Sequence, residues 1–196
     1  MTIVLEDILK EYNGQVVLEH FNLNVEDKKS YAIVGPEGCG KTTVLKIFMG
    51  TVMPDGGGVH RMGDYKYPTL HSGYVSQEGQ LVPKKNAIWN VRKVYHKASK
   101  GRVIEELSKF IPEEKLKLPV SELTDAERKL VEIVRAFVIP SDFLVMDEPF
   151  EFLNESDIQK VLAYIEENRG SRPLLMASRN EEHFGFARVI HMEKSN

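Results

Sequence analysis

The segment at residues 35–42, GPEGCGKT, constrains this chain more than any other, because it contains a complete GxxxxGK[ST] pattern. It follows a β-rich apolar stretch at residues 30–34 and precedes a helix-like one. In such a loop several backbone N–H groups turn inward on the same phosphates, which requires unhindered backbone at Gly35, Gly38 and Gly40. A glycine-rich turn with a solvated lysine is the alternative, but the strand and helix flanks favour a phosphate-binding loop.

The residues of this loop predict how a nucleotide would be held. Lys41 is expected to reach the β- and γ-phosphate oxygens, and the Thr42 hydroxyl is expected to ligate Mg²⁺. The helix that begins near Gly40 adds the positive end of its dipole. The other loop residues assigned to the nucleotide are Pro36, Glu37, Cys39 and Thr43. The sequence therefore predicts a site that binds a nucleotide together with Mg²⁺.

Length and composition are typical of one soluble globular domain, since 42% of the 196 residues are hydrophobic. The formal net charge of −3 shows no basic excess, so we expect no nucleic acid partner. Glu6 and Asp7 lie where a secretory signal would be apolar, and we expect neither a signal peptide nor a membrane span. The only cysteine, Cys39, lies in the phosphate loop, which is consistent with a reducing cytoplasm.

Hydrophobic periodicity predicts an α/β chain with a β-rich first quarter. Strands are expected at residues 3–5, 16–18, 21–25, 31–34, 143–146, 174–177 and 188–191, with weak ones around a glycine-rich turn region within 54–67. Helices are expected at residues 42–49, 87–98, 102–110, 125–138 and 157–168. Asn86 and Ser156 are the expected N-caps, and Gly50, Gly101 and Gly170 the expected boundaries. Strands that alternate with helices predict a largely parallel sheet covered on both faces.

Two acidic residues, Asp147 and Glu148, follow the apolar strand predicted at residues 143–146 and precede Pro149. Ligands of open parallel sheets bind at the carboxyl edge, where this pair would lie. We expect Asp147 to bind the Mg²⁺ of the nucleotide, and Glu148 to polarise the water that attacks the γ-phosphate. An exposed turn or helix start is the alternative for an acidic pair of this kind. The apolar run before it and the phosphate loop elsewhere favour the catalytic interpretation.

The order and spacing of these motifs resemble the nucleotide-binding domain of ATP-binding cassette (ABC) transporters across nearly the whole chain. The resemblance implies an α/β P-loop NTPase fold of the ABC ATPase type, with a mostly parallel central sheet and an N-terminal antiparallel β-subdomain. The expected core comprises residues 1–78 and 126–196, interrupted by a short helical insertion at about 79–125. The variant GCGKT and the segment GYVSQEGQLVPKKNAIWNV at residues 73–91 look most like importer ATPases, particularly those for nitrate, sulfonate or taurine.

The resemblance also implies roles for residues outside the two motifs. Tyr12 would stack on adenine, although an aromatic packed in the core is the alternative. Gln77 would contact Mg²⁺ and the attacking water and link the ATP site to the helical insertion; a solvated glutamine at a strand end is the alternative. Trp89, Val91 and Val94 would face the membrane subunit, but an apolar stripe at helical spacing also suits the core.

The chain departs from the family at residues 123–127, at Arg179 and in the loop after Pro149, where Asn154 replaces the usual Asp. Residues Leu123–Glu127, LTDAE, stand where the family has LSGGQ, which completes the partner's ATP site in a head-to-tail dimer. Thr124 can still cap the helix and contact that nucleotide, but Asp125 and Glu127 place negative charge near the expected γ-phosphate. A capped surface helix with no phosphate role is the alternative. Arg179 stands where the family has a histidine that contacts the γ-phosphate, and it cannot exchange protons as imidazole does.

From these features we expect an ATP-binding subunit that binds Mg·ATP and hydrolyses it slowly, energising separate transmembrane permease subunits. It would act as a homodimer, or as a heterodimer with another ABC ATPase, on the cytoplasmic inner face of the cell membrane. One alternative is a regulatory or catalytically impaired ABC subunit beside a competent partner ATPase, although retention of Glu148 argues against full inactivity. The other is a soluble ABC protein that acts on ribosomes or DNA. The transported substrate and the direction of transport stay open.

Overall fold

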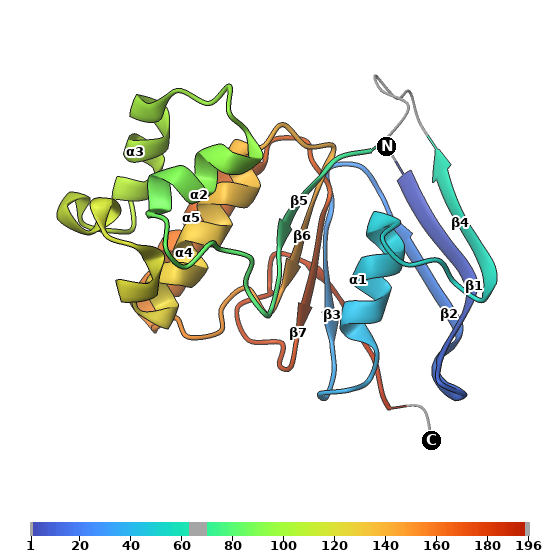
Figure 1. The fold of residues 1–196 in the computed structure, drawn as a ribbon. Coiled ribbons are helices and arrows are strands. Elements are labelled where there is room, and N and C mark those ends of the chain that lie inside the picture. Colours follow the sequence, from blue (N-terminus) through green and yellow to red (C-terminus); the bar gives the residue numbers. More distant parts are fainter. Residues whose placement is uncertain (1, 63–69, 195–196) are drawn as a thin grey trace.

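Two β-sheets and a group of helices make up the computed structural model, which describes residues 2–62 and 70–194 (Figure 1). The first sheet is antiparallel, in the order β2-β1-β4, and contains β1 (Thr2–Tyr12), β2 (Gln15–Val25) and β4 (Gly56–Met62). The central sheet has the order β5-β6-β7-β3-β8, and its neighbouring strands are parallel. Its strands are β3 (Ser30–Val34), β5 (Ser72–Val75), β6 (Phe143–Asp147), β7 (Leu174–Ser178) and β8 (Arg188–His191). The predicted parallel sheet is therefore confirmed.

The first two strands are longer than the sequence predicted. A tight hairpin at Asn13 and Gly14, both at positive φ (52° and 79°), joins two continuous strands of 11 residues each. The separate strands predicted at 3–5, 16–18 and 21–25 are thus wrong in extent. Asp7 and His20 adopt φ of 51° and 50° where the pairing register shifts. Such bulges break the alternation of apolar residues without ending the ladder, which is why the pattern suggested gaps.

The glycine run that suggested a turn lies inside β4. Gly57 has φ of 79°, and a Cβ atom there would meet the carbonyl oxygen of Asp7 at 2.3 Å. The absence of a side chain therefore lets β4 approach the bulge of β1 closely. The rest of the region predicted as weak strands and turns includes residues 63–67, which lie outside the described residues.

The helices follow the predictions closely at some ends and not at others. They are α1 (Lys41–Met49), α2 (Ala87–Val94), α3 (Lys100–Ser108), α4 (Asp125–Val138) and α5 (Glu155–Arg169), with 3-10 turns at Glu113–Lys117 and Val120–Glu122. Gly50 ends α1 and Gly170 ends α5 at positive φ, and the Asn86 side chain caps α2, as predicted. However, α2 ends four residues before the predicted 98, and α3 contains Gly101 because Ser99 caps it instead. The cap of α5 is Asn154, two residues before the predicted Ser156.

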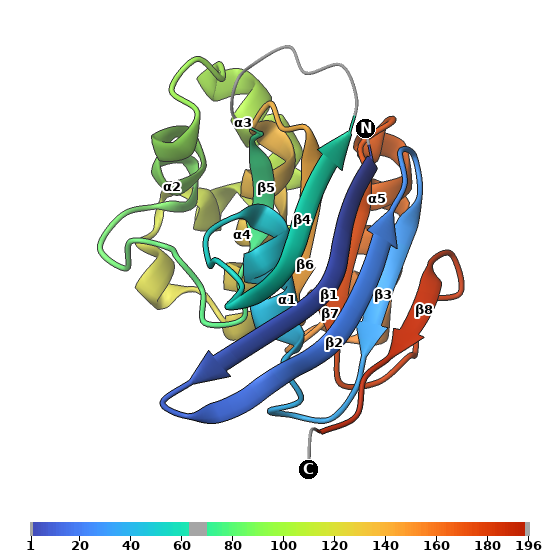
Figure 2. The ribbon, with the colours of Figure 1, turned by 90° about the vertical axis from the view of Figure 1, so that its right-hand side faces the viewer.

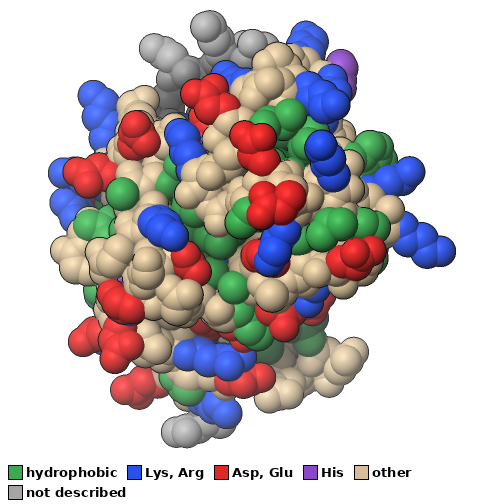
Figure 3. Space-filling model, turned by 90° about the vertical axis from the view of Figure 1, so that its left-hand side faces the viewer, with side chains coloured by type: hydrophobic (Ala, Val, Ile, Leu, Met, Phe, Trp, Pro, Cys, Tyr) green, Lys and Arg blue, Asp and Glu red, His purple; other side chains and the backbone are tan. Residues whose placement is uncertain are grey.

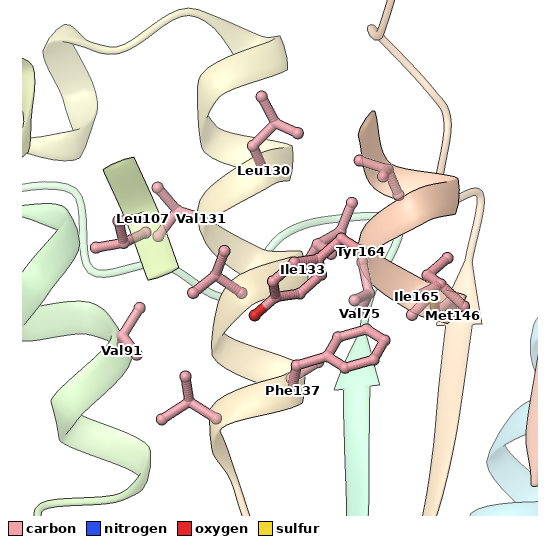
Figure 4. Close-up of a cluster of buried hydrophobic side chains, with 14 of the residues drawn as sticks. Val75, Val91, Leu107, Leu130, Val131, Ile133, Phe137, Met146, Tyr164 and Ile165 are labelled. Carbon is pink, nitrogen blue, oxygen red and sulfur yellow. The ribbon is translucent and has the colours of Figure 1, made fainter. Parts of the chain in front are cut away.

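Both faces of the central sheet are covered. On one face, α1 lies between the central and antiparallel sheets, and residues such as Phe48, Ile33 and Leu5 form one buried cluster there (Figures 1 and 2). On the other face, α4 crosses the middle of a second cluster that also includes side chains of α2, α3 and α5 (Figure 4). Because packing occupies the faces, the carboxyl edge of the sheet is left for binding.

Close packing of β5 against α4 leaves no room for a side chain at Gly73, and this can be tested by mutation. A Cβ atom at this position would lie 2.3 Å from the carbonyl oxygen of Ala136 on α4. We expect Gly73→Ala to lower the free energy of unfolding by about 1–3 kcal/mol, the usual cost of overpacking. Gly101→Ala is the control, because a Cβ there meets nothing within 4 Å and should stabilise α3 by roughly 0.4–1 kcal/mol. Urea denaturation of both variants checks this, and equal effects would contradict it.

Candidate nucleotide-binding site

The glycine-rich loop connects the carboxyl end of β3 to the start of α1. Gly38 and Gly40 adopt φ of 80° and 96°, which residues with a Cβ atom rarely do. At Gly35 a Cβ atom would meet the carbonyl oxygen of Met192 at 2.2 Å, so this glycine is also required by packing. Backbone that lacks side chains at these positions can approach a phosphate group, which fits the predicted role of the loop.

The predicted phosphate-binding lysine is buried against its own loop. Lys41 is 7% exposed, and its Nζ donates to the carbonyl oxygens of Gly35 (2.6 Å) and Pro36 (3.0 Å). These carbonyls satisfy the ammonium group, which would otherwise be a costly buried charge. Phosphate oxygens would offer the same donor a charged acceptor and a stronger hydrogen bond. The lysine is therefore held at the loop in a geometry from which it can turn to a nucleotide.

Thr42 and Asp147 come from different elements and meet at the carboxyl edge of the sheet. The Thr42 hydroxyl donates to Oδ2 of Asp147 at 2.6 Å. The other oxygen, Oδ1, is buried and has no hydrogen-bond partner among the described residues. Burial raises the pKa of Asp147, and the Thr42 hydrogen bond and the Lys41 charge only partly oppose this. An orphaned carboxylate oxygen beside a threonine hydroxyl is the oxygen donor set that Mg²⁺ prefers, so these residues fit the ion.

Glu148 and Arg179 face one another across the next part of the site. Glu148 is 9% exposed and adopts φ of 46°, and its amide donates to Ala177 of β7 at 2.9 Å. The Arg179 amide donates to Oε2 of Glu148 at 3.4 Å, while its guanidinium lies 3.8 Å from Oε1 and 3.4 Å from Glu37. Burial raises the pKa of Glu148, and the contacts with Arg179 lower it in part. A carboxyl with a raised pKa suits proton acceptance closer to neutral pH.

One pocket of about 250 Å³ brings most of the predicted residues together. Its lining consists of Tyr12, Val17, Glu37, Gly38, Gly40, Lys41, Thr42, Thr43, Gln77, Asp147, Glu148 and Arg179. Tyr12 is 42% exposed at the end of β1, so the alternative of a core aromatic is wrong. Val17 was missed, since one valine in a strand gives no signal of a pocket. Residues of β1, β2 and the phosphate loop, together with residues at the ends of β5, β6 and β7, therefore line one pocket.

Several predicted residues do not line this pocket. The side chain of Cys39 is 2% exposed beneath the loop, and Gly35 and Pro36 contribute carbonyl oxygens to Lys41. Thr124 is outside the lining; its hydroxyl accepts the Glu127 amide, and Glu127 accepts the Thr124 amide. The predicted cap at Thr124 is confirmed, and Glu127 completes it as a capping box.

The two acidic residues after Thr124 are each paired with a cation. Asp125 accepts a short hydrogen bond from Arg128, and Oε1 of Glu127 lies 2.6 Å from Nζ of Lys115. The negative charge predicted at this helix start is present, but each carboxylate has a cation beside it: Lys115 comes from a distant 3-10 turn and Arg128 from the next helical turn. Each cation offsets part of one negative charge.

Burial of the Asp147 carboxylate, which is proposed to serve binding, should lower the free energy of unfolding. Asp147→Asn keeps an acceptor for Thr42 but removes the buried charge, so we expect a gain of about 1 kcal/mol, or roughly 2–4 °C in Tm. Because the pKa of Asp147 is raised in the folded state, the gain should be largest at neutral pH. It should shrink as the pH falls through the raised folded-state pKa and vanish only well below about 3.9, the ordinary aspartate pKa, where the carboxyl is protonated in both states. Calorimetry across this range checks the prediction, and a loss of stability at pH 7 would refute it.

Residues 18–151, more than half of the chain, match the family described as ABC transporter. The spermidine/putrescine import ATP-binding protein PotA of Spiroplasma citri is 33% identical over 181 residues, which cover 85% of this chain and 50% of that protein. The zinc import ATP-binding protein ZnuC of Pseudomonas fluorescens is 25% identical over 177 residues, covering 88% and 66%. The chain spans about half the length of the PotA proteins that it matches.

Solved structures with the same fold include a dimeric bacterial ABC transporter cassette, with a TM-score of 0.83, 22% identity and coverage of 97% of this chain and 94% of that one. A bacterial Atm1-family ABC exporter with ATP bound gives a TM-score of 0.86 at 17% identity, covering all of this chain and 38% of the exporter chain. Within residues 2–62 and 70–194, no helix has the length and apolar character needed to cross a membrane. The family match over residues 18–151 shows that this chain belongs to the ABC transporter family, and its fold agrees with that of the solved ABC cassettes.

Proposed function

We propose that this chain is the ATP-binding and ATP-hydrolysing subunit of an ABC transporter whose permease subunits are separate chains. The observation that carries the proposal is the pocket in which Lys41, Thr42, Gln77, Asp147 and Glu148 converge. The proposal places the subunit in the cytoplasm, peripherally on the inner face of the cell membrane. Within it we keep residues 79–125 as a helical insertion in an ABC ATPase core.

The pocket residues divide the work of binding and hydrolysis. Lys41 exchanges its carbonyl partners for phosphate oxygens, and the exposed ring of Tyr12 offers a flat face to the adenine. Thr42 and Asp147 hold Mg²⁺, which neutralises and orients the phosphates when bound. Glu148 accepts a proton from the attacking water, and Gln77 positions that water. Each role matches the polarity and placement of the side chain in the pocket.

Arg179 limits this chemistry while it supports binding. Its guanidinium can neutralise phosphate charge, but it lies beside Glu148, where it stabilises the carboxylate and weakens it as a base. Its guanidinium also lies 3.4 Å from Glu37, another residue that lines the pocket. Slow hydrolysis is the expected consequence.

Hydrolysis in this proposal requires two ABC ATPase subunits arranged head to tail, either identical or different. The N-terminus of α4, at Thr124, serves the nucleotide of the neighbouring subunit. Ion pairing of Asp125 and Glu127 reduces the electrostatic penalty there, but Asp125 and Ala126 still add Cβ atoms where the family has glycine. This crowding, together with Arg179, favours a second candidate function, that of a weakly active subunit beside a competent partner ATPase.

The surface of α2 is the proposed contact with the permease. Trp89 is 40% exposed and Val94 is 42% exposed, whereas Val91 is fully buried, so the predicted stripe of three residues divides between surface and core. Lys85 and Lys93 lie 5.5 and 5.6 Å from the Trp89 ring centre. On the side of the molecule that carries α2 and α3, acidic and basic side chains are interspersed around hydrophobic ones (Figure 3). An exposed indole between two lysines suits an apolar helix with acidic flanks.

For the transported solute, we propose only a chemical class. Several of the relatives are named for import of spermidine/putrescine, zinc and sulfate/thiosulfate. Import of a small solute is therefore the proposal for this chain, and the nitrate, sulfonate or taurine subtype stays a prediction.

Two variants separate binding from hydrolysis. Lys41→Ala should abolish ATP binding, because the variant loses the ammonium group held at the phosphate loop. Lys46→Ala on the same helix should bind normally, because Lys46 is exposed and does not line the pocket. Glu148→Gln should keep ATP affinity and lower kcat by about 10²–10⁴-fold, the usual contribution of a general base. Calorimetric titration and phosphate release measure the two effects. Equal ATPase rates for the wild type and Glu148→Gln would reject hydrolysis by the homomeric form and leave the impaired subunit.

The permease contact has its own test. Trp89→Asp should abolish co-sedimentation with membranes that contain the co-expressed cognate permease, and it should leave ATP affinity unchanged. Phe186→Asp is the matched control, because Phe186 is 46% exposed and is remote in sequence, beyond β7. Sedimentation of the wild type with ribosomes rather than with these membranes would contradict the transporter role and support the soluble alternative.

A further inference from the structure

Three charged side chains of α4 are buried at one side of the helix, next to the segment that follows β5. Lys129, Glu132 and Arg135 are 4%, 2% and 5% exposed and are spaced three residues apart, so they share one helix face. Charged groups are almost never buried to this extent unless they are paired. Their partners therefore identify what this face of α4 does.

The partners belong to a short irregular segment, residues 76–82, that contains Gln77. Oε1 of Glu132 accepts the Gln80 amide at 2.5 Å, and Nη1 of Arg135 donates to the Gln80 carbonyl oxygen at 3.0 Å. Nη2 of Arg135 also lies 3.7 Å from Oε1 of Glu132. Both polar backbone groups of one residue are thus held by one ion pair, which we call the Gln80 clamp.

The backbone before Gln80 is shaped to reach this clamp. Gly79 has φ of 75°, and a Cβ atom there would lie 3.4 Å from Oε1 of Glu132. Nζ of Lys129 donates to the Ser76 carbonyl oxygen at 3.3 Å. Gln77, which lines the nucleotide pocket, therefore lies between two points at which α4 holds the main chain.

The far end of the segment is held by α2. Oδ1 of Asn90 accepts the Val82 amide at 2.7 Å, and its Nδ2 donates to the Val82 carbonyl oxygen at 3.3 Å. Asn90 is 2% exposed. Residues 77–82 form neither helix nor strand, so these side chains take the place of a backbone ladder. The segment thus connects Gln77 to both α4 and α2.

A buried ion pair is weak evidence for stability, because a packed apolar pair of similar volume is often as stable. Specific placement of the main chain is the property that an apolar pair cannot supply. We propose that Glu132, with Arg135, is a positioning residue that holds Gln80 so that the Gln77 side chain reaches the nucleotide pocket. The clamp also joins Gln77 to the helix whose N-terminus serves the neighbouring subunit. This inference rests on the proposed ATPase function.

The test compares three changes at the clamp. Glu132→Gln keeps an oxygen acceptor for the Gln80 amide, and Glu132→Ala removes it. The double variant Glu132→Leu with Arg135→Met removes both charges at similar volume, which protects against misfolding from an unpaired arginine. Glu106→Gln is the control, since Glu106 belongs to α3 and pairs with Lys109, the C-cap residue of that helix, at 3.0 Å.

Hydrogen–deuterium exchange of residues 78–82 without nucleotide gives the first readout. We expect exchange to rise at least about tenfold in Glu132→Ala and in the double variant, and to stay near wild type in Glu132→Gln and Glu106→Gln. In ATPase assays the same two variants should lose about tenfold in kcat with KM for ATP changed less than about twofold. A larger change in KM than in kcat would indicate a binding role and overturn the proposal.

Failure of the inference and failure of the proposed function give different results. Unchanged exchange in the double variant, or faster exchange with normal kcat, overturns the positioning role while the ATPase function stands. If the wild type binds Mg·ATP without hydrolysing it, the ATPase function fails. The positioning role of the clamp is then supported if Mg·ATP slows exchange at residues 78–82 in the wild type but not in the double variant. It is overturned if Mg·ATP has the same effect on both proteins.

Discussion

The parallel direction of the central strands is the constraint on which the rest of this structure depends. Because neighbouring strands run the same way, the phosphate loop after β3, Gln77 after β5, Glu148 after β6 and Arg179 after β7 all emerge at one edge. Parallel strands require crossover connections, and the helices that provide them cover both faces of the sheet. The edge is therefore the place where polar side chains from distant parts of the sequence can meet around one ligand.

Polar groups at this edge are satisfied to different degrees. Lys41 has two carbonyl partners, whereas Asp147 has one oxygen bonded to Thr42 and one without a partner in the described part of the chain. A residue optimised for stability would have neither a buried orphan oxygen nor a raised carboxyl pKa. Strain of this kind is characteristic of sites whose ligand supplies the missing interaction. The unsatisfied oxygen of Asp147 is consistent with the proposed binding of a nucleotide and Mg²⁺, and it has some cost in stability.

Helix α4 has a proposed role at both its N-terminus and its buried face. Its N-terminus departs from the family pattern, yet the capping box forms, and Arg128 and Lys115 pair with the two acidic residues. Its buried face packs into the main core and also carries the Gln80 clamp. One helix therefore connects the segment of Gln77 to the surface proposed for the neighbouring subunit. Figure 4 shows that buried hydrophobic side chains, among them Leu130, Val131 and Ile133, pack α4 into the core.

The sequence by itself determined the phosphate loop, the acidic pair after β6, the bounds of α4 and its cap, because each depends on residues adjacent in the chain. It also predicted a parallel sheet, since strands alternated with helices. Only the tertiary structure decided that β1 and β2 are continuous, that Asp125 and Glu127 are paired, and that Val91 belongs to the core whereas Trp89 is exposed. The clamp formed by Glu132 and Arg135 on Gln80 was equally hidden in the sequence. Local motifs record backbone conformation and chemistry, but bulges, ion pairs and burial depend on neighbours that are distant in the chain.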